Sequence, residues 1–126
     1  MATRNPKILN FNRTTGVVVQ PLVTETDLYV VPADTKTTIT GIHCCNTSAD
    51  IKNISFKLSL KPASGDNIII DIATTQKIEG TSTVTGGGLW TWEVPYPLEA
   101  GDKIIAIQET NDAIDVTLIG FEEVIV

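Results

Sequence analysis

The residues best suited to metal or redox chemistry stand together at His43, Cys44 and Cys45. An extended strand sends Cys44 to one face and His43 with Cys45 to the other, so at most two of them could reach one ion. Zinc needs three or four ligands in a spaced motif, and the sequence has no second histidine and no C-x-x-C pair. We therefore assign no metal and no cofactor, and we interpret all three as interior strand residues.

Other catalytic patterns are equally weak. The sequence has no G-x-S-x-G elbow, and carboxylate pairs such as Asp66 and Asp71 are too common to indicate a glycosidase. The run Gly86-Gly87-Gly88 lacks the Lys-Ser/Thr of a phosphate loop, so it is more typical of a flexible loop or a close approach of two backbones. No catalytic residue is assigned, and we do not expect an enzyme.

Two tryptophans, Trp90 and Trp92, share one face of a predicted strand. If exposed, this stripe could stack on a sugar ring; if buried, it would belong to the core or to a subunit interface. Because only 6% of the residues are aromatic, the core needs both, and we favour core or interface. Tyr29 and Tyr96 can join the same cluster.

The elements that would position these residues are strands. Isoleucine, valine and threonine make up 45 of the 126 residues, and such β-branched side chains favour strands. We predict one antiparallel β-sandwich of jelly-roll type over residues 17–126, preceded by an extended N-terminal arm at residues 1–16. The predicted strands cover 16–23, 27–31, 36–45, 54–61, 68–72, 89–94, 103–110 and 114–126.

Several of these segments carry specific expectations. Residues 54–61 alternate strictly between apolar and polar, which predicts one buried face. The apolar run that includes Ile68, Ile69 and Ile70 predicts a strand buried on both faces or at a subunit contact. Residues 74–88 are predicted as a loop and 95–102 as a turn, and Asn-Asp-Ala predicts a hairpin between 103–110 and 114–126.

Charge limits the partners. The chain carries 9 basic and 15 acidic residues, a net charge of −6, which argues against nucleic acid as a partner. Arg4, Lys7 and Arg13 nevertheless precede the first acid, Glu25. This basic arm predicts docking onto an acidic neighbour, and a solvated, mobile terminus is the alternative. Deletion of residues 2–13 is expected to abolish docking and leave the fold intact.

The compartment follows from two further observations. No secretion signal or membrane-spanning stretch is visible, so no membrane partner is expected. Cys44 and Cys45 are neighbours in the chain, too close for an unstrained disulfide, which suits a reducing cytoplasm.

The last predicted strand reaches Val126 and needs cover along its edge, for which a neighbouring subunit is the simplest source.

Three segments carry a resemblance to a known group of proteins: LYVVPADTKTTITGIHCCNTSAD at 28–50, ISFKLSL at 54–60 and PLEAGDKIIAIQETNDAIDVTLIGFEEV at 97–124. Together they resemble small β-sandwich structural proteins of tailed bacteriophage virions. The resemblance rests on the order of strands and turns over about residues 25–124. The Thr- and Gly-rich segment with Trp-Thr-Trp at 74–92 departs from it.

The resemblance implies a virion structural protein, made in the host cytoplasm, that joins or decorates parts of the particle as a symmetric oligomer. A capsid decoration (cement) protein is the first expectation, and a tail or head-fibre module is the alternative. A trimer bound to the major capsid protein is expected because capsid lattices offer local threefold axes. The subunit interface would use Ile68–Ile70 with Trp90 and Trp92. A carbohydrate-binding jelly roll using the tryptophan face is the rival from another class.

Overall fold

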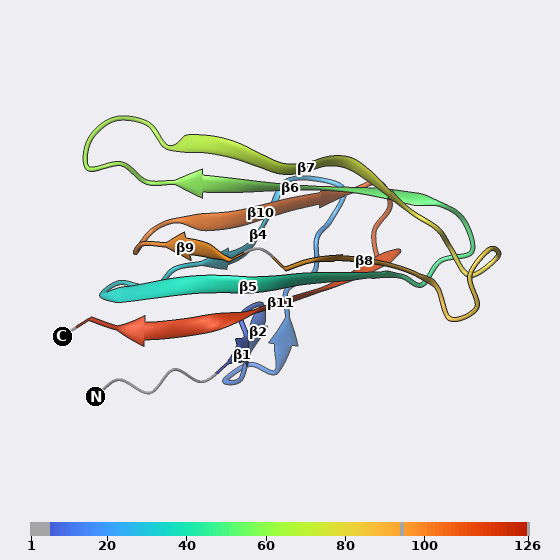
Figure 1. Ribbon diagram of the computed structural model, residues 1–126, viewed down its shortest axis with the longest axis horizontal. Helices are drawn as coiled ribbons and strands as arrows, with labels where there is room; N and C mark the ends of the chain where they lie inside the picture. The colour runs from blue at the N-terminus through green and yellow to red at the C-terminus, as the bar shows by residue number, and fades with distance from the viewer. Residues whose placement is uncertain (1–5, 94, 126) are drawn as a thin grey trace.

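The protein consists of two large antiparallel β-sheets that face each other and one small sheet in which β2 pairs with β3, as the computed structural model of residues 6–93 and 95–125 shows (Figure 1). One sheet has the strand order β1-β11-β5-β8, with β9 also paired to β5, and the other has the order β4-β10-β6-β7. The predicted all-β antiparallel sandwich is confirmed. The strands are β1 (Lys7–Ile8), β2 (Phe11–Asn12), β3 (Val17–Val18), β4 (Thr26–Val30), β5 (Thr35–Asn46), β6 (Lys52–Leu60), β7 (Ile68–Ile78), β8 (Gly88–Trp92), β9 (Tyr96–Leu98), β10 (Lys103–Gln108) and β11 (Ile114–Val124).

The core lies between the sheets and follows the alternation of the sequence. In β6, Ile54, Phe56 and Leu58 are buried, whereas Ser55 and Lys57 point to the partly exposed outer side. Strand β10 and the first half of β11 repeat this pattern. Full burial of each large aliphatic or aromatic side chain stabilises the fold by about 1.5–3 kcal/mol. None of the described residues belongs to a helix long and apolar enough to cross a bilayer.

The connection from β10 to β11 changes sheets, so the predicted hairpin between them is wrong. The buried side chain of Gln108 closes this corner. Its amide nitrogen donates to the carbonyl of Pro21 at 2.6 Å, and its amide oxygen accepts from the backbone nitrogen of Ile114 at 2.9 Å. Backbone groups at a sheet corner have no ladder partner, and here a side chain satisfies them.

The outer edge of β11 is covered by the chain's own N-terminal region. The backbone nitrogen of Leu118 donates to Asn10 Oδ1 at 3.0 Å, and Asn10 Nδ2 donates to the carbonyl of Val116 at 2.8 Å. The backbone nitrogen of Val116 donates to Gln20 Oε1 at 2.7 Å. Two side-chain amides thus take the place of a neighbouring strand. The cover expected from another subunit comes instead from the same chain.

The described part of the predicted arm is therefore docked on the sandwich. Residues Lys7 and Ile8 pair with β11, and Leu9 and Asn10 are 6% and 2% exposed. Residues 1–5 lie outside the described residues. Deletion of residues 2–13 would remove Leu9 and Asn10 and uncover the β11 edge, so the structure argues against a deletion that leaves the fold intact.

Three other boundaries differ from the sequence expectation. Strand β7 continues to Ile78, through a segment predicted as a loop, because residues 73–78 keep pairing with β6 around irregularities in register. The short strand β9 pairs with β5 inside the predicted turn at 95–102. Of the predicted strand 16–23, only Val17–Val18 is regular, because the residues that follow bond through Gln20 and Pro21 to β11 and β10.

Candidate functional site

The His-Cys-Cys run lies in β5 with the predicted alternation. Cys44 is buried between the sheets, and His43 and Cys45 are partly exposed on the outer face. The interpretation of all three as interior residues is therefore confirmed for Cys44 and wrong for His43 and Cys45, because only one face of β5 meets the other sheet. Burial, and to a smaller extent the neighbouring Cys45, raises the pKa of the Cys44 thiol to about 12, so Cys44 stays protonated. No group of three potential metal ligands occurs among residues 6–93 and 95–125.

The glycine run 86–88 is a close approach of backbones. Gly87 has a φ of +98°, and a Cβ there would lie 2.2 Å from the carbonyl oxygen of Asn46. Gly88 donates its backbone N–H to the carbonyl of Glu79 at 2.9 Å. Of the two readings offered by the sequence, the close approach describes Gly87 and Gly88. These glycines draw the loop before β8 against the ends of β5 and β7.

Both tryptophans pack against the hydrophobic core of their own chain. Trp90 stacks on Phe56 of the opposite sheet, with ring centroids 5.8 Å apart, and Trp92 stacks on Tyr96 at 4.2 Å. One face of each indole is therefore engaged within the molecule. Tyr96 joins the aromatic cluster as expected, whereas Tyr29 bonds elsewhere.

The isoleucine run is exposed in the single chain. Ile68, Ile69 and Ile70 are 55%, 52% and 44% exposed on β7, which is an edge strand. The expectation that this run is buried on both faces within the chain is wrong, and the expectation of a subunit contact stays a prediction. The other sheet ends on the same side of the sandwich with β8, where Leu89 is 75% exposed.

A second cluster of polar residues joins the N-terminal segment to the body. Lys7 Nζ lies 2.5 Å from Glu122 Oε1. The hydroxyl of Tyr29 donates to Glu122 and lies 2.7 Å from Thr37 Oγ1. Burial alone raises the pKa of Glu122, but the bonds from Lys7 and Tyr29 lower it, and the net shift is downward. Burial, together with the bond to Glu122, raises the pKa of Tyr29 above its ordinary value. The carboxylate is held ionised beside two donors.

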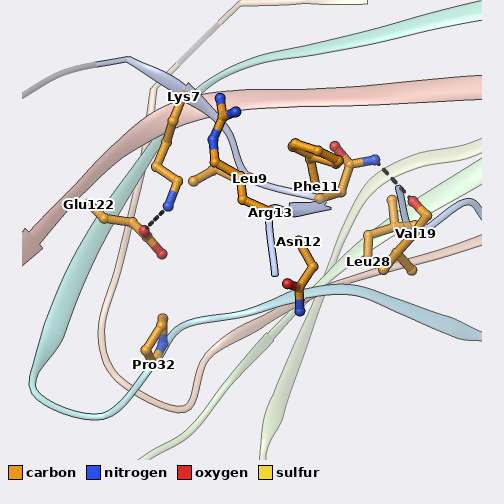
Figure 2. Close-up of a pocket in the computed structure, with 10 residues that line it drawn as sticks. Lys7, Leu9, Phe11, Asn12, Arg13, Val19, Leu28, Pro32 and Glu122 are labelled. Carbon is orange, nitrogen blue, oxygen red and sulfur yellow. Dashed lines mark hydrogen bonds and ion pairs between the residues drawn. The ribbon is translucent and has the colours of Figure 1, made fainter. Parts of the chain in front are cut away.

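A pocket of about 450 Å³ lies beside this cluster (Figure 2). One wall comes from residues 7 and 9–13 of the N-terminal segment, and the other comes from Val19, from Leu28 in β4, from Pro32 and from Glu122 near the end of β11. In Figure 2 the Lys7–Glu122 pair lies at one end of the pocket, and Val19 with Leu28 lies at the other. The lining is apolar at Leu9, Phe11, Val19, Leu28 and Pro32, and polar at Lys7, Asn10, Asn12, Arg13 and Glu122.

The structure thus brings together two of the three cations predicted for docking. Lys7 and Arg13 line the same pocket, and Arg4 lies outside the described residues. The sequence analysis missed Asn10, Tyr29 and Glu122. Tyr29 and Glu122 are far apart in the sequence, and no local pattern connects them. Asn10 follows an apolar residue in an otherwise polar segment, which is too weak a signal to identify a buried amide.

Comparison with known proteins adds no identification, because no family model matches the sequence and no curated protein matches it. Proposals about function therefore rest on the fold, the exposed surfaces and the pocket.

Proposed function

We propose that this chain is a non-enzymatic structural protein of a tailed bacteriophage virion, a capsid decoration protein that associates as a trimer on the major capsid protein. The observation that supports this proposal most strongly is the exposed apolar start of strand β7. Natural sheet edges are normally protected by charge, proline, bulges or cover, and Ile68–Ile70 are three consecutive exposed isoleucines before the first charge of the strand, Asp71. A surface of this kind marks a contact with another protein.

The arrangement of the strands supports the same class. The two facing sheets hold five and four strands, and most connections after β4 cross from one sheet to the other. We infer from this alternation a jelly-roll connectivity, an architecture that recurs in viral capsid and lectin domains. The fold alone does not distinguish these roles, so the exposed edge carries more weight.

Under this proposal the protein would be made in the host cytoplasm and would stabilise the capsid mechanically from its surface. It would need no cofactor and would bind neither nucleic acid nor a membrane. A tail or head-fibre module is the alternative within the class. The rival carbohydrate-binding role is less well supported, because Trp90 and Trp92 stack on Phe56 and Tyr96 rather than presenting a free platform.

The oligomer is tested by native mass spectrometry of the wild type and two variants. Ile69→Lys places a charge in the isoleucine run, and Val30→Lys changes a residue of similar exposure, 45% against 52%, on the opposite edge strand β4. We expect a wild-type trimer, a monomeric Ile69→Lys and a trimeric Val30→Lys. A monomeric wild type, or a trimer that survives Ile69→Lys, would refute the β7 interface.

The virion role is tested on particles. Phage particles from the source that encodes the chain are purified on a density gradient and examined by quantitative mass spectrometry. We expect the chain in the particle fraction at a fixed ratio to the major capsid protein. Its presence on isolated tails alone would favour the fibre alternative, and its absence from all particle fractions would refute the proposal.

A further inference from the structure

The pocket beside β1 has the size of a binding site, because its volume of about 450 Å³ lies within the range of known ligand sites. Its lining is divided evenly between apolar and polar residues. Leu9 and Leu28, which belong to its apolar lining, are 6% and 2% exposed, so the packing of the chain itself already covers them. The apolar lining residues that stay accessible are Phe11 and Val19, which are partly exposed, and Pro32, which is exposed. Because the buried leucines hold this part of the lining in place, the pocket is preformed.

The charges around the pocket are unbalanced. Lys7 and Arg13 supply two cations, and Glu122 supplies the one carboxylate of the lining. Lys7 is bonded to Glu122, whereas the guanidinium of Arg13 lies 5.3 Å from the ring centre of Phe11 and has no carboxylate partner among the described residues. The whole chain carries a net charge of −6, so the net positive charge of the pocket lining has the opposite sign to the charge of the chain as a whole.

Arg13 is the group that gives the pocket its chemical preference. A guanidinium presents several N–H donors in a fixed plane that matches the two oxygens of a carboxylate. The contact with the Phe11 ring is a cation–π interaction, which occupies none of the guanidinium N–H donors with a hydrogen-bond acceptor. An apolar lining next to a free guanidinium suits a ligand in which a carboxylate lies next to an apolar side chain.

We propose that this pocket binds an extended acidic–apolar peptide segment of a partner protein, with an Asp or Glu carboxylate on Arg13 and a neighbouring apolar side chain against Val19 and Pro32. The proposal deepens the proposed function and rests on it, because it names the chemistry by which a capsid protein would be held. Docking then uses a fixed pocket formed by the N-terminal segment rather than a mobile arm.

Glu122 acts in this arrangement as an internal competitor. Its carboxylate already accepts from Lys7 at 2.5 Å and repels an incoming carboxylate. Glu122→Gln removes the negative charge and keeps a side chain of the same shape. The peptide should therefore bind more tightly to this variant, whereas loss of Arg13 should weaken binding.

The test is a titration of the ¹⁵N-labelled full chain, followed by NMR, with acetyl-Leu-Glu-Leu-Glu-Leu-amide and its glutamine counterpart. We expect saturable shifts at millimolar peptide that are confined to residues 7–13, 19 and 28–32. The glutamine peptide should bind about tenfold more weakly or worse, the loss expected for one charge-assisted hydrogen bond. Equal binding of both peptides, shifts centred elsewhere, or no saturable shift would overturn the proposal.

Three variants locate the charge. Arg13→Gln should weaken binding of the acidic peptide about tenfold, and Glu122→Gln should tighten it. Lys36→Gln removes a cation that pairs with Glu99 away from the pocket and should change nothing. Because Arg13 is exposed, its variant folds even if Glu122→Gln does not. If Arg13→Gln and Lys36→Gln weakened binding equally, the peptide would be attracted by positive charge in general and not by Arg13. This result would overturn the proposed site.

This outcome is separable from the virion role. Absence of the chain from purified particles would refute the proposed function and leave the peptide titration unaffected, because that titration needs no particle. Failure of the titration, with the chain present on particles, would refute the pocket alone.

Discussion

Asn10 offers the sharpest test of how the N-terminal segment is attached. Its side chain accepts from the backbone nitrogen of Leu118 and donates to the carbonyls of Val116 and Val19. Asn10→Ala removes all three bonds and leaves the Leu118 N–H without an acceptor at a buried strand edge. An unsatisfied buried donor costs about 1–3 kcal/mol, and each lost neutral hydrogen bond costs about 0.5–1.5 kcal/mol. Because Gln20 still bonds Val116, we expect a total loss of about 2–4 kcal/mol.

The assay is urea unfolding followed by tryptophan fluorescence, with Asn12→Ala as the matched control. Asn12 also accepts two backbone bonds, from Thr14 and Thr15, but both lie in an exposed turn. Water replaces these bonds readily, so the control should lose less than about 1 kcal/mol. With a urea dependence of about 2 kcal/mol per molar, in the middle of the usual range for small proteins, Asn10→Ala should shift the midpoint by about 1–2 M.

Equal losses for the two variants would refute the reasoning, because they would mean that water satisfies the β11 edge as well as Asn10 does.

Asn10→Asp tests the acceptor role of this side chain separately from its donor role. It can still accept from Leu118 but presents a second acceptor, and a charge, to the Val116 carbonyl. We expect it to be less stable than Asn10→Ala at neutral pH and to recover as the pH falls and the carboxyl is protonated.

Three further predictions follow from single residues. The pKa of Glu122 is lowered in the folded state, so its contribution to stability is present above its unfolded pKa of about 4.3 and is lost as the pH falls through the folded value. Urea unfolding at several pH values should therefore show a smaller decrease in the unfolding free energy with falling pH for Glu122→Gln than for the wild type. The same pH dependence in both proteins would contradict this. Burial raises the pKa of Cys44, so a disulfide reagent at pH 8 should modify Cys45 in the native protein and Cys44 only after unfolding, and equal rates would contradict this. Gly87→Ala combines a positive φ with a clash against backbone, whereas Gly65→Ala at a similar φ meets open space. The unfolding free energy should therefore fall by about 1 kcal/mol for Gly65→Ala and by about 2–4 kcal/mol for Gly87→Ala, and equal losses would argue against the close approach.

The parts of the fold that local pattern determines were predictable from the sequence. Strict alternation placed β6 correctly and identified Ile54, Phe56 and Leu58 as core. The same rule put Cys44 on the opposite face of its strand from His43 and Cys45, although it did not show that only the Cys44 face is buried. These predictions succeed because the period of a strand is fixed by its backbone, whatever lies around it.

The sequence analysis failed where the outcome depends on distant partners. The Asn-Asp-Ala turn has the chemistry of a hairpin, but Gln108 bonds Pro21 and Ile114 and directs the chain to the other sheet. An apolar run such as Ile68–Ile70 predicts burial, but the pattern does not tell whether the same chain or another molecule covers the run. Its exposure in the single chain could therefore not be foreseen. The Lys7–Glu122 contact joins residues 115 positions apart, beyond the reach of any local pattern.

The N-terminal segment connects the stability of the fold with the proposed binding site, because residues 7–10 cover the β11 edge and residues 7 and 9–13 line the pocket. If this segment opens locally, the binding-competent fraction falls and the apparent affinity falls with it. Gln20 does not line the pocket, but its amide bonds Val116 in both directions and holds the same cover in place. Gln20→Ala should therefore weaken binding of the acidic peptide without changing any group that touches it. Conversely, the peptide should slow hydrogen exchange at the backbone nitrogens of Leu9 and Leu118, because a ligand that binds only the closed form stabilises it by mass action. Unchanged affinity in Gln20→Ala, with unchanged exchange on binding, would show that the cover and the pocket are independent.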